Sequence, residues 1–235
     1  MGKIIYPRKG EVHTAPVTIP AVFADATWEQ IIECCETNTV PATWEVGDQK
    51  AMTINGTDYL IDIIGKNHDA YYGGGTAPLT FQMHDLYATY YQMYTNASNH
   101  TGWHGCDMYL KHLPSLLALM PSEVQAGIKG VRKTTSMGNQ WSNLRTTNEK
   151  LFLLSEVEIF GTITNSVSGE GEQYAYYSAG NSKAKMLHSS YIAYWWTRSP
   201  YSMNALEYCT VSTGGQSVHH NANFATIGVS FAFCF

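Results

Sequence analysis

The sequence predicts an α+β fold of antiparallel sheets with two or three helices, formed by a single domain. In the first half, apolar residues recur at helical spacing, and an Asn-Gly pair joins two strand-like runs. The second half has short apolar runs separated by long loops, which is typical of short strands. This segregation of helices and strands favours α+β over a parallel sheet. Hydrophobic residues form 44% of the 235 residues, enough for one sizeable core.

Residues 1–25 are expected to form an arm or linker outside the core. Pro7, Pro16 and Pro20 interrupt this segment, which has little apolar periodicity. It lacks the apolar stretch of a signal peptide, and no part of the chain approaches the roughly 20 apolar residues of a membrane span. We therefore expect a soluble, non-exported protein whose folded domain covers residues 26–235.

Three helices are predicted from apolar spacing and capping signals. The first covers residues 28–37, where Thr27 precedes the apolar pattern and Gln30 is placed to close a capping box on it. Leucines at helical spacing between residues 110 and 117 indicate a second helix. Pro121 is typical of the first turn of a third.

The strands are predicted from alternation and turn residues. Two antiparallel strands at Ala51–Ile54 and Thr57–Ile64 flank an Asn-Gly turn. Residues 71–101 are expected to be a long excursion with little regular structure. Ile227–Phe235 alternates cleanly and predicts a half-buried strand. Short apolar runs also occur at Leu151–Leu154, Val157–Phe160 and Tyr191–Thr197.

Charge and cysteine content exclude several classes of function. A net charge of −5 gives no positive electrostatic potential that would attract the phosphate backbone, so nucleic acid is not an expected partner. Five cysteines at irregular spacing fit neither a disulfide framework nor a zinc site. They are expected to be free, mostly buried thiols in a chain that can fold in a reducing cytoplasm.

Several segments together resemble a domain family of unknown function that is common in gut-bacterial and phage tail proteins. They occur in order between residues 27 and 235: Trp44–Asp48, Ile63–Asp69, Leu79–Phe81, Gly102-Trp103, Leu151–Glu158, Glu170–Tyr174, Trp195–Pro200 and Gly228–Cys234. Two departures stand out. Cys106-Asp107-Met108-Tyr109 replaces the usual Ser-x-Met-Arg, and Ser230 replaces the usual arginine after Gly-Val.

The last two of these segments also resemble the C-terminal half of C-type-lectin-like domains, including variable proteins that retroelements diversify. The resemblance implies a C-type-lectin-like fold of the formylglycine-generating-enzyme-like subtype, with a variable ligand-binding region at about residues 197–227. It further implies a receptor-binding adhesin of a phage or prophage tail, found in the virion or, before assembly, in the bacterial cytoplasm. Its expected partner is a protein or glycan on a cell surface, and a homo-oligomer such as a trimer would multiply modest affinities.

The stretch 201–227 has the composition of a binding surface. It contains one charged residue, Glu207, among small polar and aromatic residues, the set that antibody loops favour. Tyr208, Cys209, Val211 and the Gly214-Gly215 turn are expected to be scaffold. The predicted ligand contacts, expected on one exposed face, are Tyr201, Met203, Asn204, Leu206, Glu207, Thr210, Ser212, His219, His220, Asn221, Asn223 and Phe224. On composition alone, a plain Ser/Asn-rich surface loop is the alternative.

Other residues suggest sites that we do not favour. Trp195, Trp196 and Arg198 could form a sugar-stacking platform, but aromatic residues in a central strand are more often core, with the arginine as a hydrogen-bond hub. The sequence has no cluster of acidic residues of the kind that a calcium site needs. Candidate metal ligands are His68, Asp69, His84, Asp85, His100 and His104, and no metal or cofactor is expected.

Catalysis is not expected, although one enzymatic alternative shares the implied fold. Oxidases that make formylglycine use two nearby cysteines, whereas Cys209 and Cys234 are distant in sequence and each fits a core strand position. No Ser-His-Asp set, phosphate loop or paired-carboxylate motif stands out. The other alternative to a diversified adhesin is an undiversified structural module of a tail or surface.

Overall fold

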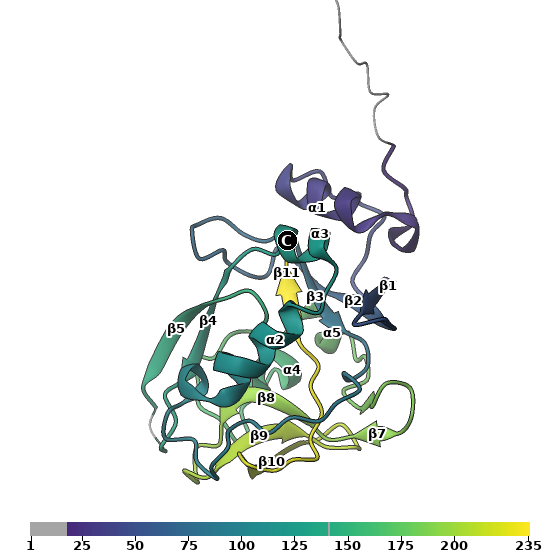
Figure 1. The fold of residues 1–235 in the computed structure, drawn as a ribbon. Helices are drawn as coiled ribbons and strands as arrows, with labels where there is room; N and C mark the ends of the chain where they lie inside the picture. Colours follow the sequence, from purple (N-terminus) through teal and green to yellow (C-terminus); the bar gives the residue numbers. More distant parts are fainter. Residues whose placement is uncertain (1–17, 141) are drawn as a thin grey trace, which may run out of the picture.

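A four-stranded antiparallel sheet with the order β1-β2-β3-β11 joins three strands from the first half of the chain to the C-terminal strand (Figure 1). This computed structural model describes residues 18–140 and 142–235. Three smaller antiparallel sheets have the orders β10-β9-β8, β4-β5 and β6-β7. The predicted α+β class with antiparallel sheets is therefore confirmed. None of the helices among the described residues is long and apolar enough to cross a membrane.

The strands are short, as predicted for the second half. In chain order they are β1 (Gln49–Ile54), β2 (Thr57–Lys66), β3 (Leu79–Met83), β4 (Val131–Ser136), β5 (Leu144–Glu149), β6 (Lys185–Met186), β7 (Ile192–Ala193), β8 (Trp195–Pro200), β9 (Glu207–Val211), β10 (Ser217–Asn221) and β11 (Ala232–Cys234).

The helical segments occur in both halves of the chain. They are η1 (Phe23–Asp25), α1 (Trp28–Glu36), η2 (Trp103–Gly105), the π-helical turn η3 (Met108–His112) that continues into α2 (Leu113–Leu117), α3 (Ser122–Gly127), α4 (Glu156–Phe160) and α5 (Ala175–Ser178). Helix α1 begins at the predicted Thr27–Gln30 capping box. The β1–β2 hairpin turns at Asn55-Gly56, where both residues have positive φ angles, as the sequence predicts.

The expectation for residues 71–101 is wrong in part, because this stretch contains the central strand β3. All residues of β3 are buried, since β2 and β11 pair with its two edges and both faces of the strand are covered. A strand that is buried on both faces carries no polar alternation. The sequence pattern therefore did not reveal it.

The assignment of helices to the first half is also wrong, because α4 and α5 lie in the second. The apolar run Val157–Phe160 belongs to α4, which begins at a second capping box formed by Ser155 and Glu158. This Ser-x-x-Glu signal was present in the sequence. Leu151–Leu154 forms no strand of its own, although Phe152 makes an isolated bridge to Ala232.

The C-terminal segment Ile227–Phe235 lies between two apolar clusters. Its odd-numbered residues pack into the cluster that also holds α1 and the β1–β2 hairpin. The even-numbered Ala232 and Cys234 belong to a second cluster around α4, α5 and Trp195. The alternation is real, but the expectation of a half-buried strand is wrong because both faces are covered.

The N-terminal arm begins to pack earlier than predicted. Phe23 is buried against Trp44 and Phe81, with ring centroids 5.4 and 6.1 Å away. Residues 18–25 therefore belong to the folded structure, contrary to the expected boundary. Residues 1–17 lie outside the described residues, and the arm stays a prediction there.

Candidate functional site

The stretch that the sequence singles out folds as the β9–β10 hairpin and its flanking loops. With β8 it forms a three-stranded sheet at the end of the molecule opposite α1 (Figure 1). Tyr208, Cys209 and Val211 are buried, and Gly215 has a φ of +77° in the turn. The predicted scaffold role of these residues and of the strand-turn-strand is confirmed.

Two of the predicted ligand contacts are inside the protein, which corrects the prediction for them. Thr210 is fully buried, and its hydroxyl lies 2.9 Å from Nδ1 of His220. Ser212 is also buried, and its hydroxyl donates to Gln216 Oε1 in the turn. Strand β9 lies between β8 and β10 and is covered on both faces, so the residues that alternate with Cys209 and Val211 are not displayed.

The other predicted contacts reach the surface. Met203, Leu206 and Phe224 are exposed by 72%, 45% and 47%, and because single exposed apolar side chains are common, it is their grouping on neighbouring loops that favours an interface. Asn223 is exposed as well. The partly exposed members of the set are Tyr201, Asn204, Glu207, His219, His220 and Asn221.

One group of these side chains lies on one side of β10. The rings of Tyr201 and His219 stack with centroids 3.9 Å apart and planes 7° from parallel. Nδ1 of His219 is 3.0 Å from Oε2 of Glu207, within ion-pair distance but without the alignment of a hydrogen bond. Asn204 Nδ2 donates to the same carboxylate oxygen at 3.0 Å. These four side chains form one polar and aromatic cluster.

A second group lies on the other side of the strand. His220 packs edge-on against Tyr194, at 4.8 Å between centroids, and against Phe224 at 5.4 Å. Adjacent residues of a strand point to opposite faces, so His219 and His220 cannot share one. The expectation of a single exposed face is therefore wrong. The candidate surface is the outer edge of the sheet, formed by β10 and the loops 201–206 and 222–226.

The buried side chain of Asn99 holds one of these loops in place. Its Nδ2 donates to the carbonyl oxygens of Tyr201, Asn204 and Glu207 at 3.3, 3.0 and 2.7 Å. Its own backbone N–H donates to Ala205 O at 2.7 Å, and its Oδ1 accepts from Asn139 N. Sequence reasoning missed this residue, because nothing in the sequence links position 99 to a loop a hundred residues away.

Arg198, a residue of β8, is a buried hydrogen-bond hub, as the sequence suggested. Its guanidinium forms a two-pronged ion pair with Glu158, and it also donates to Thr135 Oγ1 and Leu153 O. Trp195 and Trp196 are fully buried, so they offer no platform to a sugar. Ser230, where the resembling family has arginine, donates to Met83 O at 2.9 Å and makes no ion pair.

The ion-pair network extends from Glu158 to Asp69, one of the candidate metal ligands that the sequence analysis did not favour. Lys133 Nζ contacts Asp69, lies 3.1 Å from Glu158, and donates to Tyr174 Oη at 2.7 Å. Burial raises the pKa of Asp69, but the charge of Lys133 and its hydrogen bonds outweigh burial and lower it to about 2. The two cations and two carboxylates balance, which is the pattern of a structural network rather than of an unpaired catalytic group.

The candidate metal ligands His84 and Asp85 have other partners. His84 Nδ1 pairs with Asp62, at 2.9 Å from Oδ2, and this hydrogen bond raises the pKa of His84. Asp85 instead accepts from the N–H of Met186. Among residues 18–140 and 142–235, no group of three or more His, Cys, Asp or Glu side chains has the arrangement of a metal site.

All five cysteines are free and buried, as predicted. Burial raises the pKa of every thiol, to about 12 for Cys35 and Cys106. Cys209 lies in β9 and Cys234 in β11, which belong to different sheets. A thiol becomes nucleophilic as the thiolate, so these positions do not favour thiol chemistry.

Comparison with known proteins assigns a family but no activity. A family model described as "Domain of unknown function (DUF6273)" matches residues 80–235. Neither a curated protein nor a solved structure shows a significant match to the chain. The matched region is most of the chain and holds Arg198 with its partner Glu158, the β9–β10 hairpin and the C-terminal strand. The chain belongs to the family of proteins that carry this domain of unknown function.

Proposed function

We propose that this protein is a ligand-binding module that presents the edge of the β8–β9–β10 sheet to a receptor. The proposed fold is C-type-lectin-like, of the formylglycine-generating-enzyme-like subtype. In this proposal the chain is a retroelement-diversified variable protein and acts as a receptor-binding adhesin of a phage or prophage tail. Its partner is a protein or glycan on a bacterial cell surface.

The observation that carries the proposal is the division of the hairpin into a buried scaffold and a displayed edge. Tyr208, Cys209, Thr210 and Val211 are buried, whereas exposed Met203, Leu206 and Phe224 flank the half-buried side chains of β10. Substitutions at such an edge would leave the core packing intact. A binding surface that tolerates sequence change needs this separation.

A fixed loop conformation supports the same proposal. Asn99 ties three carbonyl groups of the 201–207 loop to the protein interior, so the loop loses little conformational entropy when a partner binds. At the other end of the hairpin, the buried carboxylate of Glu156 accepts from Ser217 of β10 and from the backbone of the neighbouring 164–166 segment. The candidate edge is thereby held on both sides.

The alternatives have less support. An undiversified structural module would not need large apolar side chains at an open sheet edge. A formylglycine-forming oxidase needs two reactive cysteines, whereas the two near the C-terminus are buried, and burial raises the pKa of both. We therefore propose a binding protein without catalytic activity.

A cell-binding experiment tests the proposal. The fluorescently labelled full chain, presented as a trimer on a scaffold to add avidity, is incubated with a panel of gut-bacterial cells and measured by flow cytometry. A variant with the three exposed edge side chains changed is expected to lose binding at least tenfold, because exposed aromatic and apolar anchors carry most interface energy. The changes are Met203→Ser, Leu206→Ser and Phe224→Ser.

The matched control replaces exposed leucines elsewhere. Leu60, Leu110 and Leu119 are exposed by 46%, 54% and 38%, and the triple serine variant is expected to bind like the unchanged chain. If no cell type binds the trimer, the binding function is wrong. If the control loses binding equally, the binding surface is not this edge. An adenine-biased template repeat and a reverse transcriptase beside the gene would distinguish a diversified protein from an undiversified one.

A further inference from the structure

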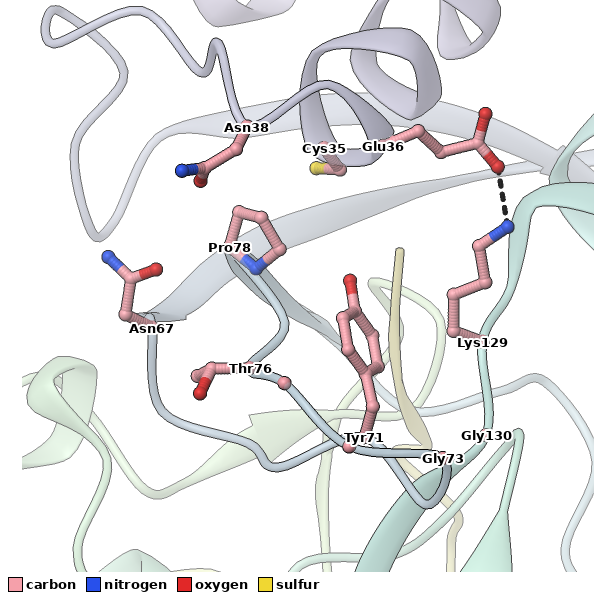
Figure 2. Close-up of a pocket in the computed structure, with 12 residues that line it drawn as sticks. Cys35, Glu36, Asn38, Asn67, Tyr71, Gly73, Thr76, Pro78, Lys129 and Gly130 are labelled. Carbon is pink, nitrogen blue, oxygen red and sulfur yellow. Dashed lines mark hydrogen bonds and ion pairs between the residues drawn. The ribbon is translucent and has the colours of Figure 1, made fainter.

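A cavity lies at the end of the molecule that holds α1, far from the β9–β10 hairpin (Figure 1). Its volume of about 890 Å³ is within the roughly 300–1,000 Å³ range of small-molecule sites. Three parts of the chain surround it, as Figure 2 shows: the end of α1, the 67–78 connection between β2 and β3, and the Lys129-Gly130 pair before β4.

The lining carries no unpaired charge. Its two charged side chains, Lys129 and Glu36, form an ion pair with each other at 2.5 Å (Figure 2). Burial raises the pKa of the other two titratable side chains, Cys35 and Tyr71, to about 12, so both stay protonated. The cavity therefore has no unpaired charge to bind an anion or a cation, and a neutral ligand suits it best.

The remaining polar side chains are amides and a hydroxyl that are free to bind a ligand. Asn38 and Asn67 make no side-chain hydrogen bond within the described part of the chain, and neither does Thr76. In Figure 2 the two carboxamides are drawn near each other on one side of Pro78, one below the end of α1 and the other just after β2. Each carboxamide offers both donors and an acceptor, which matches hydroxyl groups that donate and accept at once.

The cavity also has a fixed aromatic wall. Tyr71 stands among these residues, and its hydroxyl donates to Phe235 O at 2.6 Å, which fixes the orientation of the ring (Figure 2). Beside it, Pro78 and the run Gly73-Gly74-Gly75 give apolar contact without bulky side chains. An aromatic wall next to neutral amides suits a molecule with one C–H face and several hydroxyl groups.

We propose that this cavity binds a neutral carbohydrate unit, one or two sugar residues in size, with Asn38 and Asn67 bonding its hydroxyl groups and Tyr71 packing against its ring. This site is separate from the proposed adhesin edge. Sugar binding here would anchor the protein to a glycan while the other end contacts its partner.

Both asparagines have left-handed backbone conformations, which permits a clean test. Their φ angles are +55° and +52°, so glycine can replace each without strain while removing the amide. The full chain, labelled with ¹⁵N, is titrated with a panel of neutral mono- and disaccharides at millimolar concentrations. The side-chain NH₂ signals of Asn38 and Asn67, identified by their loss in the glycine variants, are expected to shift with at least one sugar.

The affinity for that sugar is expected to fall about fivefold in Asn38→Gly and in Asn67→Gly, the factor that corresponds to one net hydrogen bond of about 1 kcal/mol. Asn55→Gly is the matched control, because Asn55 has a φ of +49° but lies in the β1–β2 turn outside the cavity. Its affinity is expected to be unchanged.

Three outcomes would overturn the proposal. No neutral sugar shifts the two NH₂ signals, or the glycine variants bind as well as the control, or short uncharged peptides shift these signals and sugars do not. The unfolding midpoints of the variants show whether each is folded. Because these signals report only on the cavity, failure here leaves the cell-binding experiment on the hairpin edge unaffected.

Discussion

Replacing Asn99 with alanine should loosen the 201–207 loop while leaving the rest of the fold in place. The change removes the donor that three carbonyl groups share and the acceptor for Asn139 N. Each net hydrogen bond contributes about 1 kcal/mol, and a buried group left without a partner costs about 1–3 kcal/mol. The loop is partly exposed, so water replaces some of these bonds. We expect a loss of about 2–4 kcal/mol in the free energy of unfolding.

Two measurements check this expectation. Urea unfolding gives the global loss, which should lower the melting temperature by roughly 4–16 °C for a chain of this size. Hydrogen exchange reports on the loop through the backbone N–H of Tyr201, which donates to Glu207 O at 3.0 Å in the native state. This amide should lose protection by a larger factor than the amides of β2, because the change acts locally.

A control and a second variant sharpen the test. Asn96→Ala removes an exposed amide of the same connection, whose side chain makes no hydrogen bond among the described residues, and should change stability by less than about 0.5 kcal/mol. Asn99→Asp keeps the acceptor but turns a carboxylate oxygen toward three carbonyl oxygens, and should destabilise more than Asn99→Ala. If Asn99→Ala behaves like the control in both measurements, the loop is not held by this side chain.

Three further predictions concern the interior. Glu158→Gln leaves the buried Arg198 and Lys133 short of one carboxylate, and should cost about 3–5 kcal/mol in urea unfolding; a loss below 1 kcal/mol would contradict the role of the network. Burial raises the pKa of Glu170 to about 7, so the folded state binds its proton more tightly than the unfolded state, and stability should fall as pH rises from about 4.5 to about 7. Glu170→Gln should flatten this dependence, and an unchanged slope would assign it to other groups. Finally, the native thiols should react with a disulfide reagent only at the rate of unfolding, and faster labelling would show an accessible cysteine.

Local signals allowed much of the fold to be predicted. The Thr27–Gln30 capping box and the Asn-Gly turn each act within a few residues, so they specify α1 and the β1–β2 hairpin directly. Strand β3 could not be found in the same way, because its pattern depends on β2 and β11 covering its two edges. Helix α4 carried a local signal, but its short apolar run resembled a strand.

The candidate site was predictable in position but not in shape. Composition and turn residues located the β9–β10 hairpin and its buried scaffold. The burial of Thr210 follows from β9 being the central strand, which is set by the order of strands in the sheet. His219 and His220 lie on different sides because adjacent residues of a strand alternate between its faces. Asn99 acts over an even longer separation, and only the folded chain brings it to the loop it holds.

The two ends of the 197–227 region meet at its base. Trp196 N donates to Gly228 O at 3.0 Å, and Gly228 N donates to Tyr194 O at 2.8 Å, so the chain leaves the core and returns to it through one pair of hydrogen bonds. The free-energy cost of closing a loop rises slowly with the length of the loop, by only about 0.6 kcal/mol for each doubling. The exposed loops of the region, 201–206 and 222–226, should therefore accept insertions and deletions as well as substitutions, whereas the buried strands β8 and β9 should not. Under the proposed function, relatives with longer or shorter loops at this edge would enter a receptor surface to different depths while keeping the same core.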